Sequence, residues 1–222
     1  VFDGTGMVAM PGMTDAHVHM GCLFAKGEFP VDYATVLTVA KCKNALMAGF
    51  TTFRDAGSVS EGLKLAFDEG VLPGPRIYPC GAYISQTCGH GDSEYAHTYR
   101  DIQYRHPSST VLADGVPEII RAVREQFYRG ASHIKLMATE ILNRHEDIRL
   151  LFGTDMMITG PDYQVEQSED IRYYEKRFGT MRALRALTGT ANEVFALTTY
   201  QNPYPKGKIG VLEAGSYADL LL

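Results

Sequence analysis

The sequence predicts an α/β fold built on a parallel sheet with helices on its faces, either open or closed into a barrel. Strand-like and helix-like segments alternate four times before residue 138. The strand-like segments are apolar on both faces, which is typical of parallel strands covered by helices. Five parallel strands of one barrel-like sheet are expected near residues 8–19, 50–55, 76–85, 132–137 and 148–154.

Apolar residues at helical spacing predict the segments between these strands. The expected helices run from about 32 to 47, 60 to 67, 117 to 127, 165 to 178 and 181 to 187. Asp32 is placed to cap the first helix, and Gly49 supplies its stop. The stretch from Gln86 to Asp114 is polar, aromatic and long, and contains three histidines. It is predicted to be a functional loop or lid, with a disordered insertion as the alternative.

Composition excludes several classes of protein. A chain of 222 residues that is 45% hydrophobic can bury the core of one domain. The net charge of −5 argues against nucleic-acid binding. No apolar run has the roughly 18 residues of a membrane span, and no signal peptide is visible. Four cysteines without a C-x-x-C pair favour a reducing, cytoplasmic compartment. Cys88 is expected to be a buried thiol rather than a ligand.

Two histidines, His17 and His19, end the first apolar strand. Side chains alternate along a strand, so both imidazoles project to the same side, about 6–7 Å apart. Such a pair can bind one metal ion. The alternatives are a chance pair on a solvated strand and another metal fold that uses His-x-His, such as a cupin barrel.

Lys135 and Asp155 also lie at the carboxyl ends of expected strands, where parallel α/β folds assemble their sites. A lysine in an apolar strand needs a partner or a lowered pKa. As a neutral amine it can react with carbon dioxide to give a carbamate, an anionic metal ligand. Asp155 is placed to bind a metal and to take a proton from metal-bound water, whose pKa can fall to about 7. The alternatives are a snorkelling lysine and a capping aspartate.

Together these residues resemble the amidohydrolase superfamily. Residues 11–19, Pro-Gly-Met-Thr-Asp-Ala-His-Val-His, look like its P-G-hydrophobic-x-D-x-H-x-H signature of strand 1. Lys135 matches the carboxylated lysine of strand 4, and Phe152-Gly153-Thr154-Asp155 matches the strand-8 aspartate. Further motifs are similar to the imidazolonepropionase-related branch, with its dipeptidases, carboxypeptidase-like enzymes and related ochratoxin-hydrolysing amidases: Gly74-Pro75-Arg76-Ile77-Tyr78, Ser85-Gln86-Thr87, Gly89-His90-Gly91-Asp92 and Asn202-Pro203-Tyr204-Pro205.

The resemblance implies a (β/α)8 TIM barrel over residues 8–204, beside a small β-sandwich built from residues 1–7 and 205–222. It implies one or two divalent ions, usually zinc, held by His17, His19, carboxylated Lys135 and Asp155. Asp155 would be catalytic, and His90 would polarise the scissile carbonyl or, alternatively, only order its loop. The implied partner is a small amide or dipeptide-like substrate, with no nucleic acid or membrane, and homo-oligomer formation is left open.

The sequence also departs from the family pattern. Members supply two more metal histidines from strands 5 and 6, whereas only residues 139–151 separate the expected lysine and aspartate strands here. The resemblance therefore implies that strands 5–7 are missing, with a discontinuity near Glu140-Ile141. The chain is a fragment, an internally deleted product or a joining of separated segments. Two functions follow: a metal-dependent hydrolase of C–N bonds, or an inactive or truncated relative that acts as a subunit or scaffold.

Overall fold

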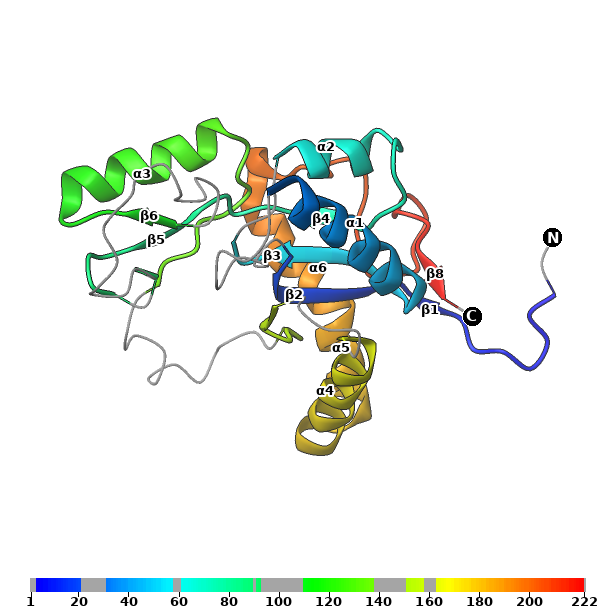
Figure 1. The fold of residues 1–222 in the computed structure, drawn as a ribbon. Helices are drawn as coiled ribbons and strands as arrows, with labels where there is room; N and C mark the ends of the chain where they lie inside the picture. The colour runs from blue at the N-terminus through cyan, green and yellow to red at the C-terminus, as the bar shows by residue number, and fades with distance from the viewer. Residues whose placement is uncertain are drawn as a thin grey trace.

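The computed structural model describes residues 3–20, 31–57, 61–89, 91–92, 110–137, 151–157 and 163–221. At its centre lies a four-stranded sheet in the order β4-β3-β2-β7 (Figure 1). Its strands are β2 (Met13–His19), β3 (Phe50–Asp55), β4 (Arg76–Tyr78) and β7 (Met156–Met157). All three strand pairs are parallel. The predicted parallel α/β architecture is therefore confirmed for this sheet.

Helices pack on this sheet as its apolar strands require. Helix α1 (Val31–Met47) contacts β3, α2 (Glu61–Asp68) contacts β4, and α5 (Thr180–Leu187) contacts β2. The other helices are α3 (Val116–Tyr128), α4 (Tyr163–Phe178), α6 (Gly189–Phe195) and the 3-10 helix Ala196–Gln201. Asp32 lies inside the first turn of α1 rather than before it, because the helix begins at Val31. No helix in the described ranges is long and apolar enough to cross a membrane.

Three aromatic rings form the centre of the core. Phe50 stacks on Phe53 and on Phe152, with ring centroids 6.3 and 6.1 Å apart. All three side chains are almost completely buried. Phe152 comes from the segment just before β7, so the core already joins the beginning and the end of the barrel segment. Burial of these three aromatic side chains away from water is the main favourable contribution that holds β3 and the segment before β7 together.

The first predicted strand, 8–19, is two strands. β1 (Met10–Pro11) pairs antiparallel with β8 (Leu220–Leu221), and only β2 joins the central sheet. Gly12 separates them, and a Cβ there would lie 2.1 Å from Thr51 Oγ1. The β1–β8 pair lies beside the sheet, and the segment before β1 extends away from it (Figure 1). The division into residues 1–7, 8–204 and 205–222 stays a prediction.

The predicted strand 76–85 is also broken, because Gly81 turns the chain with a φ of 70°. β5 (Tyr83–Ser85) leaves the central sheet and pairs in parallel with β6 (Thr110–Leu112). β6 lies in the stretch expected to be a loop or lid, so that expectation was wrong for residues 110–112. The Thr87 amide donates to Asp114 Oδ1 at 3.0 Å, which joins the two ends of this stretch.

The last two expected strands are less regular than predicted. Residues 132–137 contribute a single parallel bridge between Leu136 and Ile84, so the expectation of a full strand was wrong. Residues 151–155 are not a strand either, although the Phe152 carbonyl accepts from the Ala16 amide at 2.8 Å. The proposed discontinuity near residue 140 lies outside the described residues. The expectation of one continuous five-stranded sheet was therefore wrong, because the strands are interrupted at Gly12 and Gly81 and β1 and β5 pair with other strands.

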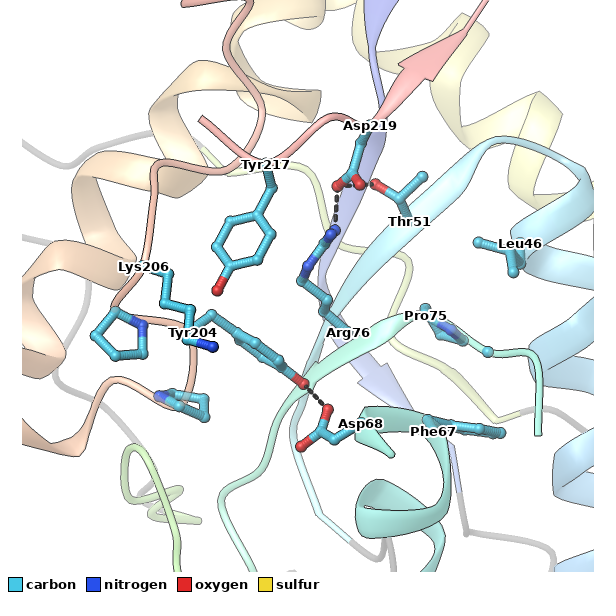
Figure 2. A pocket seen from close by; sticks show the side chains of 13 residues that line it. Leu46, Thr51, Phe67, Asp68, Pro75, Arg76, Tyr204, Lys206, Tyr217 and Asp219 are labelled. Carbon is cyan, nitrogen blue, oxygen red and sulfur yellow. Dashed lines mark hydrogen bonds and ion pairs between the residues drawn. The ribbon is translucent and has the colours of Figure 1, made fainter. Parts of the chain in front are cut away.

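At the amino-terminal end of β3 and β4, the C-terminal segment is joined to the sheet by side chains (Figure 2). Arg76 pairs with Asp219, which also accepts from Thr51 Oγ1 at 3.1 Å. The Arg76 guanidinium carbon lies 4.2 Å from the centre of the Tyr217 ring. Tyr204 donates to Asp68 at 2.8 Å. These residues line a cavity of about 520 Å³.

Candidate metal centre

At the opposite end of the sheet, β2 brings both of its histidines to one carboxylate. His17 Nε2 lies 3.0 Å from Asp155 Oδ1, and His19 Nε2 lies 3.4 Å from the same oxygen. One potential ligand atom from each of the three side chains falls within 4.8 Å of the others. The expected proximity of Asp155 to His17 is therefore observed, although the two residues are far apart in the sequence.

The turn before Asp155 explains how its carboxylate reaches the histidines. Gly153 packs directly on His17, and a Cβ at Gly153 would lie 2.6 Å from His17 Cβ. The Asp155 amide donates to the His17 carbonyl at 2.7 Å. Asp155 itself has a φ of 53°, a conformation that aspartate tolerates better than most residues. The sequence Gly-Thr-Asp thus suits a tight turn against β2.

Asp15, a fully buried residue of β2 two positions before His17, holds the turn that carries Asp155 in place. Its carboxylate accepts from the Thr154 amide at 3.2 Å and from Thr154 Oγ1 at 2.8 Å. It also accepts from the His17 amide at 3.2 Å. A buried carboxylate with several donors is a stable anchor. Asp15 therefore joins the strand that carries the histidines to the turn that carries Asp155.

Lys135 completes the group. Its Nζ lies 3.1 Å from His17 Nε2, although residue 135 belongs to the irregular segment after α3. Burial lowers the pKa of the Lys135 ammonium, while the nearby Asp155 carboxylate acts in the opposite direction. The sequence argument required either a partner or a lowered pKa of a lysine in this position, and both are found here.

The electrostatics of the two imidazoles suit metal binding. Burial, assisted by the Lys135 charge, lowers the pKa of His17 to about 4. Burial also lowers the pKa of His19. Both rings are therefore neutral at pH 7, which is the form that binds metals. Ligand atoms around a tetrahedral zinc are about 3.3 Å apart for bonds of about 2.0–2.1 Å, close to the two observed imidazole–carboxylate distances. The donor set fits a divalent ion.

Several polar neighbours were not singled out from the sequence. Arg54 donates from Nη1 to the Ala16 carbonyl at 3.2 Å. Burial, followed by the Arg54 charge, lowers the pKa of His133 to about 3. The Tyr83 ring stands edge-on to His19, with centroids 6.4 Å apart. Arg54 offered the same signal as Lys135, because it is a cation in an apolar strand. Tyr83 offered none beyond its place in an apolar segment.

Two further predictions concern His90 and Cys88, in the segment that follows β5. His90, proposed to act on the substrate carbonyl, lies outside the described residues. Cys88 is exposed, so the expectation of a buried thiol was wrong. Its backbone has a φ of 57°, and its amide donates to Asp92 Oδ2 at 2.8 Å, which points the short turn outward. Cys42 and Cys80 are the buried free cysteines of the described ranges.

Known proteins resemble this chain in sequence and in structure. Ochratoxinase from Aspergillus niger is 34% identical over 152 residues, which are 60% of this chain and 31% of the relative. This chain thus matches about a third of that relative's length. The crystal structure of A. niger ochratoxinase superposes with a TM-score of 0.51 at 26% identity, over 88% of this chain and 51% of that one.

Two further crystal structures support the fold. A prolidase complexed with N-methylphosphonate-L-proline gives a TM-score of 0.74 over 99% of this chain and 80% of its own, at 20% identity. An amidohydrolase gives 0.55 over 91% of this chain and 54% of its own, at 28% identity. The model of the amidohydrolase family matches residues 8–148, more than half of the chain and including both histidines of β2. The chain belongs to the amidohydrolase family.

Proposed function

We propose that this protein is a metal-dependent hydrolase of amide bonds in small, dipeptide-like or cyclic substrates. One observation carries the proposal: a single oxygen of Asp155 faces the Nε2 atoms of His17 and His19 at 3.0 and 3.4 Å. Two neutral imidazoles and a carboxylate are a donor set that zinc favours. Membership of the amidohydrolase family supports the same reaction class.

In this proposal His17, His19, Asp155 and a carboxylated Lys135 hold one or two divalent ions, with zinc favoured by the nitrogen-rich donor set. A bound divalent ion acidifies water and polarises a carbonyl group. Lys135 suits carboxylation because burial lowers its pKa and its Nζ lies 3.1 Å from His17 Nε2. The added carboxylate would bring a further anionic oxygen to the same point.

Asp155 is the proposed general base. Its side chain is 72% exposed, so water and substrate reach it, whereas the His19 side chain is only 9% exposed. The carboxylate would take a proton from the attacking water and return it to the leaving amine, as general acid–base catalysis requires. His90 is proposed to donate to the developing oxyanion. The hydrogen bond from the Asp155 amide to the His17 carbonyl keeps the carboxylate beside the two imidazoles.

The names of the relatives support the proposed substrate class. Ochratoxinase and prolidase are the names of similar proteins, and one of the solved neighbours carries a proline derivative. A small amide with a free carboxylate, such as an N-acyl amino acid or a dipeptide, is therefore the proposed substrate. The number of ligands favours a second candidate, a non-catalytic subunit, because the metal-ligand cluster found among the described residues has only three members, His17, His19 and Asp155.

The test compares the 222-residue chain with a version in which a homologous segment is inserted between Glu140 and Ile141. Elemental analysis and zinc titration give metal content, and N-acyl amino acids and dipeptides serve as substrates. We expect zinc binding by both forms and strong hydrolysis by the extended form only. The proposal fails if neither form binds zinc or hydrolyses an amide. Vigorous zinc-dependent turnover by the 222-residue chain would instead show that the inserted segment is dispensable.

A further inference from the structure

The strand that carries both histidines contains a bulge beside them. Asp15 lies opposite Phe53 of β3, and the next registered pair is Val18 with Asp55. Three steps along β2 therefore match two steps along β3, and neither Ala16 nor His17 has a counterpart in the neighbouring strand. A bulge of this kind locally bends a strand and redirects its side chains.

Side chains supply the hydrogen bonds that the ladder omits at this point. The Ala16 carbonyl accepts from Arg54 Nη1 at 3.2 Å, and the His17 amide donates to Asp15 Oδ1 at 3.2 Å. On the other side of β2, the Ala16 amide donates to the Phe152 carbonyl at 2.8 Å. A buried backbone carbonyl without a partner is strongly unfavourable. The guanidinium therefore stabilises the bulged form of the strand.

Arg54 is well placed to do this because it belongs to β3, which lies between β4 and β2. Its backbone is registered with Tyr78 of β4, while its side chain reaches across to β2. The side chain thus joins β3 to β2 at Ala16, the residue before His17. Its planar group of donors suits a fixed carbonyl better than the flexible ammonium of a lysine does.

We propose that Arg54 is a positioning residue of the metal centre, whose hydrogen bond to the Ala16 carbonyl holds the bulge of β2 and so aims His17 at Asp155. Loss of the bulge would change the position and direction of the His17 side chain relative to Asp155, while leaving the residue itself unchanged. This inference rests on the proposed function, because it assigns the aimed imidazole to a metal.

The experiment compares Arg54→Gln and Arg54→Lys with the unaltered chain, and uses Arg76→Gln as the control. Arg76 is an arginine of the adjacent strand that binds Asp219 at the other end of the sheet. Three quantities are measured: zinc affinity by competition with a chromophoric chelator, the visible absorption of the cobalt(II)-loaded chain, and hydrogen exchange of the His17 amide without metal. Thermal melts establish that each variant is folded.

Arg54→Gln is expected to lower zinc affinity by about 10–100-fold, as loss of a group that orients a ligand usually does. The cobalt spectrum should change and the His17 amide should exchange faster. Arg54→Lys should recover part of each effect. Arg76→Gln should alter neither zinc affinity nor the cobalt spectrum, and its His17 amide should exchange faster only by the amount that its overall loss of stability explains. If Arg54→Gln does not fold, Arg54→Lys decides, with a smaller but measurable loss of affinity expected.

Unchanged affinity and unchanged His17 exchange in the folded Arg54 variants would overturn the inference. Equal losses of affinity in Arg54→Gln and Arg76→Gln would also overturn it, because they would reflect general destabilisation. If the unaltered chain binds no zinc but His17 exchange still depends on Arg54, the bulge-holding role stands and the proposed metal function fails. The two failures are thus distinguishable.

Discussion

The two ends of the central sheet carry polar clusters of similar size and opposite organisation. At the amino-terminal end, the charges of Arg76 and Asp219 are matched one to one, and Thr51 adds a hydroxyl to the same carboxylate. At the carboxyl-terminal end, two neutral imidazoles converge on a single oxygen of Asp155, whose side chain is 72% exposed. The first cluster is closed by its own partners. The second presents several ligand atoms to one point.

The difference separates a candidate binding site from a cluster that only stabilises the fold, called here the structural lock, which consists of Arg76, Asp219, Thr51, Tyr204 and Asp68. Tyr204, at the amino-terminal end, accepts from the Ile77 amide at 2.8 Å and donates to Asp68 at 2.8 Å, so its hydroxyl joins three chain segments. Such matched hydrogen bonds stabilise the fold by modest amounts each. Atoms that are all metal ligands and lie within 4.8 Å serve stability poorly until a cation joins them. The convergence of several metal-ligand atoms on one point is therefore the feature by which we identify the carboxyl-terminal cluster as the candidate site.

The largest expected effect is on turnover. Asp155→Asn keeps the size and the left-handed backbone preference of the residue but removes its capacity to take a proton. In the chain form that hydrolyses amides, kcat should fall by roughly 10²–10⁴, while much of the zinc affinity remains. Steady-state assays and zinc titration measure the two quantities. Asp219→Asn, at the other end of the sheet, is the matched control and should leave kcat unaltered. Near-normal turnover in Asp155→Asn would remove its catalytic role.

The next effect is on stability at the opposite end. Arg76→Gln removes the charge that pairs with Asp219 and stacks on Tyr217. Because both side chains of the pair are mostly buried, unfolding should become easier by about 1.5–3 kcal/mol. Denaturant unfolding measures this loss. Arg121→Gln is the control, since its pair with Glu125 is long, at 3.8 Å, and exposed. Equal losses in the two variants would contradict a structural lock.

Gly153→Ala should affect both stability and site geometry. The added Cβ would lie 2.6 Å from His17 Cβ and must push the turn away from β2. Overpacking of this kind costs about 1–3 kcal/mol, and zinc affinity should fall because Asp155 moves with the turn. Gly62→Ala is the matched control: a Cβ there meets nothing within 4 Å, so helix α2 should gain slightly. A harmless Gly153→Ala would mean that Asp155 is placed by other contacts.

Stability should also depend on pH. Burial lowers the pKa of His17 to about 4 and that of His133 to about 3, whereas both titrate near 6.5 when unfolded. The unfolded chain therefore binds more protons between these values. The stability that the neutral imidazoles contribute to the metal-free chain is present above pH 6.5 and is lost as pH falls toward 4, by roughly 2–3 kcal/mol between pH 7 and 5, because the partly exposed His17 contributes less than its full pKa shift. His133→Gln should flatten the profile. Equal stability at pH 7 and 5 would contradict the prediction.

The sequence by itself determined the class of fold and predicted which residues are the candidate metal ligands. Phe50–Asp55 was predicted as a strand with its observed limits, because a β-branched and aromatic run lies between Gly49 and a carboxylate. Alternation along β2 predicted that His17 and His19 share a side. Asp155 was expected near them because carboxyl ends of parallel strands meet at one edge of a sheet. These are short-range patterns or general rules of α/β folds.

Only the tertiary structure decided which strands pair and what surrounds the site. Gly12 and Gly81 end strands that look continuous in sequence, because the approach of Thr51 at one and a positive φ at the other are set by distant parts of the chain. The bulge at Ala16 lies beside a hydrogen bond from Arg54 of the neighbouring strand, and no local pattern in β2 predicts either. Pairing register and packing distance join residues far apart in sequence, so their energies appear only when the chain is folded.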